Sequence, residues 1–295
     1  MSSVAQRKPA QSRLVHGSAL QAHVQNAGLY LIYAAVALVF LFPLLWVASL
    51  SLKDLSTLFA YPPRLIPQDP AFGNYVEVFK QSQLGIFLVN SAKIVVFTVL
   101  GTLLVAIPAA FAFSRTHFRS KNLFLFGILI FQMMSPLVIA IPLYRYFNVI
   151  GILNQHWSTI LVYIAVELPF QTWLLRGFFS SIPRSLDEAA IIDGCTPLQA
   201  MIHVILPVST PGIASVIVYA GIRSWSQFII PFVLLSDNEK FPVSVGILNY
   251  QSTVEVISTH FLAAASVLSV LPAVLLFVVF QRFIISAITA GAVKG

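Results

Sequence analysis

The feature of this sequence that most restricts its fold is the recurrence of apolar runs long enough to cross a lipid bilayer. A membrane-spanning helix needs about 20 mostly apolar residues. Charged residues make up only 9% of the chain, against about a quarter in soluble domains. The sequence therefore predicts an all-α, polytopic membrane protein and excludes an ordinary soluble fold. Six spans are expected, over residues 28–50, 86–113, 122–143, 156–175, 211–235 and 260–283.

The distribution of Lys and Arg predicts which ends of the spans face the cytoplasm. The apolar run of the first span is longer than that of a cleaved signal peptide, which is about 7–15 residues, so we expect a signal anchor. With residues 1–27 inside, most of the 17 Lys and Arg residues lie on the inner side, as the positive-inside rule requires. Both termini are therefore expected in the cytoplasm, and the net charge of +7 is explained by contact with anionic membrane lipid. Nothing in the sequence resembles a nucleic-acid-binding motif.

These spans divide the chain into five expected parts. They are a cytoplasmic N-terminal tail (1–27), a first transmembrane helix (28–50), an external loop (51–84), a membrane core (85–284) and a cytoplasmic C-terminal tail (285–295). No internal repeat is present, although many secondary transporters contain one. A self-contained secondary transporter or channel for a small polar solute nevertheless stays open as an alternative.

One segment of the core, residues 184–209, differs from its apolar surroundings and contains the stretch DEAAIIDGCTPLQAMIHVILP. Ser185 and Thr196 each begin a capping-box pattern, and Gly194 between them can adopt the left-handed conformation that often ends a helix. The second helix carries an apolar stripe and ends at Pro207. The segment thus predicts a helix, a glycine turn and a helix on the cytoplasmic side. Lipid headgroups could cover the stripe, but the cluster of acids and scarcity of basic residues favour a protein partner.

The same residues resemble the EAA loop of permease subunits of bacterial ABC importers. The resemblance is carried by Glu188-Ala189-Ala190, Gly194 and Val204-x-Leu206-Pro207, with valine where the family favours isoleucine. Further motifs are similar to the MalG-type permeases of carbohydrate importers. They are Ser49–Lys53, Gly73–Tyr75, Asn90-Ser91, Ile141–Tyr144, Leu174–Phe179 and Thr289–Gly295. Trp225-Ser226-Gln227-Phe228 departs from the Trp-Asn-Glu-Phe of many relatives.

The resemblance implies a type I ABC importer transmembrane fold in the bacterial inner membrane. It implies four kinds of partner: a second, different permease, two cytoplasmic ATPase subunits, an external solute-binding protein and a sugar-like solute. The ATPases would hold ATP and magnesium, so this chain is expected to be no enzyme and to bind no cofactor or metal; it has no phosphate-binding loop of its own. The residues implied to dock on the ATPase are Glu188, Ala189, Ala190, Asp193, Gly194, Leu198, Met201, Leu206 and Pro207.

Two charged residues fall near the middle of expected spans, where an ionised side chain costs about 2.5–3.5 kcal/mol on insertion scales. They are Glu167 in the fourth span and Arg223 in the fifth. They could form a structural ion pair, or they could contact the solute separately. Gln227 lies one turn beyond Arg223, and with Trp225 it completes the candidate set for the solute path.

Overall fold

The computed structural model describes residues 12–58, 61–62, 64–81, 83–116, 119–248 and 259–292, and within these ranges it contains helices and no β-strand. Four helices of this described part are long and apolar enough to cross a membrane, at Gly28–Ser51, Leu84–Arg115, His156–Ser181 and Thr259–Phe283. They belong to α1 (Ser12–Ser51), α4 (Leu84–Arg115), α7 (His156–Ser181) and α15 (Thr259–Ala292). Four of the expected spans are thereby located in the structure.

The other two expected spans are not single helices. The third is divided into α5 (Lys121–Phe131) and α6 (Pro136–Val149), and the fifth into α11 (Thr210–Ser226) and α12 (Ile229–Leu234). Both breaks precede a proline, which lacks the N–H that would bond to the carbonyl four residues earlier. Pro136 leaves the carbonyl of Gln132 without its helical donor, and Pro231 does the same for Gln227. The expected count of six helices is therefore not exact, because apolar length does not reveal such breaks.

The freed carbonyl at the second break is satisfied by side chains from other elements. Gln227 O accepts hydrogen bonds from Tyr163 Oη of α7, at 3.2 Å, and from Ser244 Oγ of α13 (Val243–Gly246), at 2.8 Å. A buried carbonyl without a partner would be costly, so these two bonds stabilise the break between α11 and α12 as a defined feature of the fold.

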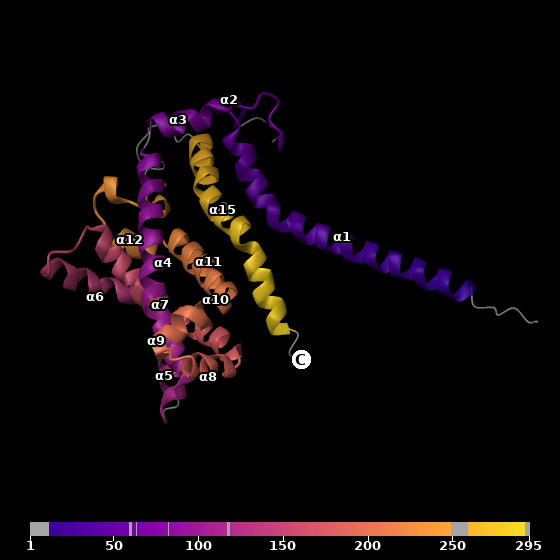
Figure 1. Ribbon diagram of the computed structural model, residues 1–295. Helices are drawn as coiled ribbons and strands as arrows, with labels where there is room; N and C mark the ends of the chain where they lie inside the picture. The colour runs from indigo at the N-terminus through magenta and orange to yellow at the C-terminus, as the bar shows by residue number, and fades with distance from the viewer. Residues whose placement is uncertain are drawn as a thin grey trace, which may run out of the picture.

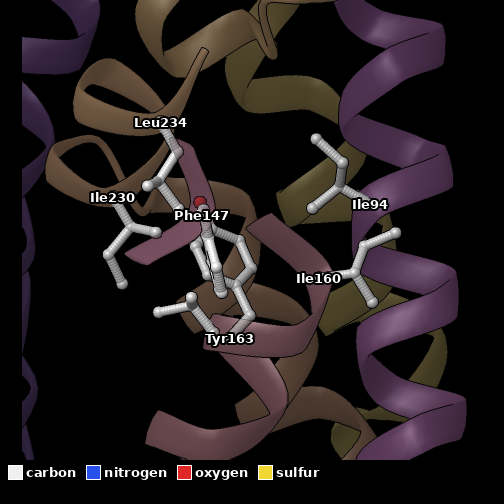
Figure 2. Close-up of a cluster of buried hydrophobic side chains, with 7 residues drawn as sticks. Ile94, Phe147, Ile160, Tyr163, Ile230 and Leu234 are labelled. Atoms are coloured by element: carbon white, nitrogen blue, oxygen red, sulfur yellow. The ribbon is translucent and has the colours of Figure 1, made fainter. Parts of the chain in front are cut away.

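A buried apolar cluster joins the broken helices to the central pair, α4 and α7. Figure 2 shows Phe147 of α6 beside Tyr163 of α7, close to Ile230 and Leu234 of α12, with Ile94 of α4 nearby. The central pair itself is closely packed, since a Cβ atom at Gly101 of α4 would clash with the side chain of Ile164 on α7. The short helices α6 and α12 are thus packed parts of the bundle.

At the end of the bundle that the sequence predicts to face outside, which we call the outer end, two sequence motifs meet. α3 (Gly73–Gln81) begins next to the end of α1, and the Asn74 Nδ2 donates to the carbonyls of Ser51, at 2.9 Å, and Lys53, at 3.0 Å. The Tyr75 and Ser51 hydroxyls lie 2.6 Å apart. These bonds satisfy carbonyls at a helix C-terminus, which otherwise lack intrahelical partners. The external segment, which also contains α2 (Leu55–Leu58), is therefore fixed to α1 by Asn74.

A second segment at this end, residues 235–243, is fixed by residues at the N-terminal ends of α4 and α7. We call it the outer loop, because the sequence predicts that this end of the bundle faces outside. It contains the short helix η2 (Asn238–Lys240). Asn90 Nδ2 donates to the carbonyls of Glu239, at 2.7 Å, and Phe241, at 3.2 Å, and Ser91 Oγ accepts from the Val243 N–H at 2.7 Å. The other bonds come from the start of α7: Asn154 Oδ1 accepts from two loop N–H groups, and His156 Nε2 lies 2.9 Å from the Lys240 carbonyl.

The first and last long helices pack against each other. In Figure 1, α15 runs down the bundle, contacts α1 near its outer end and approaches α11 further along, while the rest of α1 diverges from the bundle. Both helices extend beyond the expected spans, because α1 begins at Ser12 and α15 continues to Ala292. The expected tails are therefore partly helical. Residues 1–11 and 293–295 lie outside the described residues.

Candidate functional site

The residues expected to contact an ATPase form a compact group of short helices, which we call the helical loop (residues 184–209). It consists of α8 (Ser185–Ile192), α9 (Pro197–Ala200), the π-helical segment η1 (Met201–Ile205) and α10 (Leu206–Val208). Figure 1 shows it at the end of the bundle where α4 and α15 also end. The segment Pro197–Val208 meets α11 at 80°, so the second half of the loop runs across the bundle end while α11 runs through the bundle.

The turn between the two halves has the geometry of a Schellman motif. Gly194 has φ +88°, its N–H donates to the carbonyl of Ile191 at 3.0 Å, and the Cys195 N–H donates to the carbonyl of Ala190 at 2.9 Å. This pair of bonds satisfies the last carbonyls of α8 and requires a left-handed residue between them. The conformation expected of Gly194 is therefore confirmed.

Of the two expected capping boxes, one is present. Thr196 Oγ1 accepts from the Gln199 N–H, and Gln199 Oε1 accepts from the Thr196 N–H at 2.8 Å, so α9 begins as expected. The box expected at Ser185 and Glu188 is wrong. Arg184 is already in the helical conformation and makes no side-chain capping bond. Ser185 therefore lies inside the first turn, where its hydroxyl is not in the N-cap position.

The helical loop exposes only part of the expected docking set. The exposed members are Glu188, Ala189, Asp193, Gly194, Leu198 and Pro207, while Ala190 and Met201 are buried and Leu206 is half-buried. The apolar stripe of the second helix is divided, because Ile205 is fully buried beside Leu175 and Phe179, whereas Leu198 and Ile202 remain exposed. One side of this helix thus holds the loop to the bundle, and the other side is free.

Sequence reasoning missed two isoleucines on this free surface. Ile191 and Ile192 follow the Ala189-Ala190 pair, and Ile192 is 85% exposed, among the most exposed large apolar side chains of the described chain. The signal was available, since two consecutive isoleucines cannot both face the inside of a short helix. They add apolar area beside Gly194 and Leu198.

Sequence reasoning also missed the function of Arg115, which it counted only as a basic residue on the inner side. Its Nε atom lies 2.7 Å from Asp187 Oδ2, and both side chains are more than four-fifths buried. Its Nη1 atom donates to the carbonyl of Ile182 at 3.3 Å. One side chain at the end of α4 therefore contacts α8 and the C-terminal cap of α7.

The structure brings together the two charges inside the membrane region. Arg223 Nε lies 3.6 Å from Glu167 Oε1, and Gln171 Nε2 donates to Glu167 Oε2 at 3.3 Å. The Glu167 side chain is 5% exposed and that of Arg223 is 47% exposed. The carboxylate is therefore enclosed, while the guanidinium has a free side.

The remaining two candidates of the membrane region lie apart from this pair. Trp225 Nε1 donates to the carbonyl of Ser269 at 2.9 Å and so attaches α11 to α15. Gln227 occupies the break after α11. Among the described residues, no three His, Cys, Asp or Glu side chains lie close enough to share a metal ion.

Comparison with known proteins agrees with this geometry. Residues 102–289, which include the helical loop, Glu167 and Arg223, match a family described as the binding-protein-dependent transport system inner membrane component. The chain belongs to this family. It is accordingly a multi-pass membrane protein and the transmembrane, non-enzymatic component of a transport system.

Two curated members of the inner membrane component family illustrate the similarity. The chain is 34% identical to the galactooligosaccharides transport system permease protein GanQ of Bacillus subtilis, over 90% of this chain and 94% of the relative. It is 32% identical to the sulfoquinovosyl glycerol transport system permease protein SmoH of Agrobacterium fabrum, over 86% of this chain and 89% of the relative.

The fold is similar to that of a solved importer. A chain in the crystal structure of a bacterial ABC transporter involved in the import of the acidic polysaccharide alginate superposes with a TM-score of 0.75 and 25% identity, covering 94% of this chain and 99% of that chain. The structure is therefore a type I ABC importer transmembrane fold, with two of its spans broken as described above.

Proposed function

We propose that the chain is the permease subunit of an ATP-driven, binding-protein-dependent importer of a sugar or sugar-like solute. The observation that carries this proposal is the helical loop, an exposed surface of small and apolar residues at one end of the bundle, whose two halves are joined by a left-handed glycine. The substrate class is supported by relatives named for galactooligosaccharides, sulfoquinovosyl glycerol, and trehalose and maltose.

The proposal assigns the helical loop to a cytoplasmic ATPase. Ala189 and Gly194 are small and exposed, so the backbone of a partner can approach closely, and Leu198 and Ile192 supply apolar area beside them. Glu188 and Asp193 add charge at the rim. The members of the docking set that are at least partly buried would stabilise the conformation of this surface rather than contact the partner. They are Ala190, Met201 and Leu206.

The remaining parts of the assembly follow from the same proposal. A second, different permease would form the other half of the translocation path, and two ATPase subunits, rather than this chain, would bind ATP and magnesium. An external solute-binding protein would deliver the solute to the opposite side. Both termini of this chain would then face the cytoplasm.

The solute path is proposed to run beside α11. A half-exposed guanidinium in the membrane region is costly against lipid, so the free side of Arg223 should face the path or the second permease. Glu167 would hold Arg223 in this orientation, while Gln227 and Trp225 would set the position of the break and of α11 beside the path.

The test of the docking assignment is a pair of substitutions at Gly194. A Cβ atom here would meet nothing within 4 Å, so any effect arises from the positive φ, which costs a residue with a side chain about 1–2 kcal/mol. Asn tolerates this conformation better than a β-branched residue. Gly194→Val should therefore lower the recovery of the ATPase with the affinity-purified permease severalfold or more at unchanged membrane levels, and Gly194→Asn should retain most of it.

The matched control is Gly127→Ala in α5, which lies in open space without a positive φ and should change nothing. If no ATPase is recovered with the unsubstituted protein, or if Gly194→Val binds it normally, the docking assignment is wrong. A secondary transporter or channel would instead show solute flux in vesicles that contain this chain alone.

A further inference from the structure

Arg115 forms an ion pair that joins a membrane helix to the helical loop. It lies in the last turn of α4, and its partner Asp187 lies in the first turn of α8. A cation is favourable at a helix C-terminus and an anion at a helix N-terminus. Each of the two charges is therefore stabilised twice, by the helix end at which it lies and by the opposite charge of its partner.

The burial of this pair separates it from an ordinary surface salt bridge. The Arg115 and Asp187 side chains are 11% and 16% exposed, whereas the Asp237–Lys240 pair of the outer loop is 53% and 40% exposed. Exposed pairs hold two side chains together only weakly. A nearly buried pair is costly to break, since each partner would remain enclosed without its counter-charge. Asp187 and Arg115 should therefore move together.

The position of Arg115 in the chain lets the ion pair connect the helical loop to a helix that is distant in sequence. The helical loop is covalently continuous with α7 on one side and with α11 on the other, but α4 ends far from it in sequence. Through Asp187 and the Ile182 carbonyl, Arg115 connects α4 to the junction between α7 and α8. It is thus a polar contact through which a displacement of α8 reaches α4, a helix that is not covalently joined to the loop and that also meets it in the buried cluster of Ile205 with Ala106 and Ala110.

We propose that Arg115 is a positioning residue that makes α4 follow α8 when a partner displaces the helical loop. This inference rests on the proposed function, because the partner is the ATPase. It assigns to Arg115 and Asp187 the transfer of motion to α4, and it assigns the binding of the ATPase to the exposed residues around Gly194.

Hydrogen–deuterium exchange of the purified permease–ATPase assembly, with and without the non-hydrolysable nucleotide AMP-PNP, separates binding from transfer. In the unsubstituted assembly, AMP-PNP should change the exchange of both α8 and the inner half of α4. In Asp187→Asn and in Arg115→Gln, the α8 response should remain. The change in α4 exchange that AMP-PNP causes should be smaller by at least about fivefold, a factor at the lower end of ordinary coupling between sites.

Two further variants keep the proposal testable if a single substitution impairs folding. The charge exchange, Arg115→Asp with Asp187→Arg, should restore part of the α4 response, although not all, because each charge then opposes its helix dipole. Asp237→Asn breaks the exposed pair at the other end of the molecule and should leave both responses unchanged. A purely structural contact would raise the exchange of α4 with and without AMP-PNP alike.

The outcomes distinguish the two proposals. An α4 response that survives in both single variants, or a charge exchange that restores nothing, refutes the transfer through Arg115. An unsubstituted assembly in which α8 itself does not respond to AMP-PNP refutes the docking assignment instead.

Discussion

The ion pair in the membrane region gives a prediction that is asymmetric between its two partners. At 3.6 Å, two unit charges attract by about 4–5 kcal/mol at an effective dielectric constant of about 20. Because 47% of the Arg223 side chain is exposed, we discount this by about half for solvent screening. Arg223→Gln leaves the enclosed carboxylate of Glu167 without a counter-charge and should cost about 2 kcal/mol of folding free energy.

The reverse substitution should cost less. Glu167→Gln keeps an oxygen that can accept from Gln171, and the guanidinium of Arg223 can turn to its exposed side, so we expect a loss under about 1 kcal/mol. The double variant contains no enclosed charge and should return to within about 1 kcal/mol of the unsubstituted protein. The coupling between the two sites should therefore be about 2 kcal/mol.

The assay is the thermal unfolding midpoint of the purified protein in lipid nanodiscs, followed by tryptophan fluorescence. On the scale of soluble chains of similar size, about 2–4 °C per kcal/mol, Arg223→Gln should lower the midpoint by about 4–8 °C. Asp237→Asn, which breaks an exposed pair, is the control and should not shift it. Equal and additive losses from Glu167→Gln and Arg223→Gln would refute the reasoning, since they would show that the two side chains act independently.

The outer loop and its neighbours give three more predictions. Asn90→Ala removes the hydrogen bonds to the carbonyls of Glu239 and Phe241 and should lower the local stability of the outer loop by about 1–3 kcal/mol. Residues 235–243 should then exchange hydrogen faster at normal membrane levels, and unchanged exchange would contradict the assigned bonds. Gly246→Ala places a Cβ atom against the buried Phe87 ring and should lower the unfolding midpoint through overpacking, at about 1–3 kcal/mol, whereas Gly85→Ala, in open space, should not. Hydrogen bonds from Lys240 and Asn154 hold the pKa of Asp237 below its usual value, so its contribution to the order of the loop should be present above that usual value and should be lost only as the pH falls through the lowered one. The measurement is the exchange of the loop amides in the unsubstituted protein relative to Asp237→Asn at the same pH, because intrinsic amide exchange itself accelerates with pH; a ratio that changes between pH 6 and pH 8 would contradict this assignment.

The sequence predicted those parts of the fold that depend on local physics. Apolar length located α1, α4, α7 and α15, and glycine and threonine at their positions in the helical loop predicted the left-handed turn and the cap of α9. The breaks at Gln132 and Gln227 were missed, because a proline in an apolar run can bend a helix, start one or end one, and tertiary contacts decide which. The bonds of Tyr163 and Ser244 to Gln227 are such contacts.

The sequence likewise predicted only some features of the candidate site. The conformation of Gly194 was predicted from its position between two helices, and an ion pair of Glu167 with Arg223 was one of the two alternatives that the sequence left open. The division of the second loop helix into a buried and a free side did not, because periodicity shows that Leu198, Met201 and Ile205 share one side but not how far the neighbouring bundle covers it. The pair of Arg115 with Asp187 joins residues more than 70 positions apart, and no local pattern indicates it.

The packing of α1 against α15 has a consequence for the biosynthesis of the chain. α1 leaves the ribosome before α15, with more than 200 residues between Ser51 and Thr259. At about 5–20 residues per second, α1 waits on the order of 10–40 s before its neighbour is made. A chain that stops before α15 would leave one side of α1 without its partner helix, and membrane quality-control proteases could distinguish such a truncated chain from a finished one by that surface.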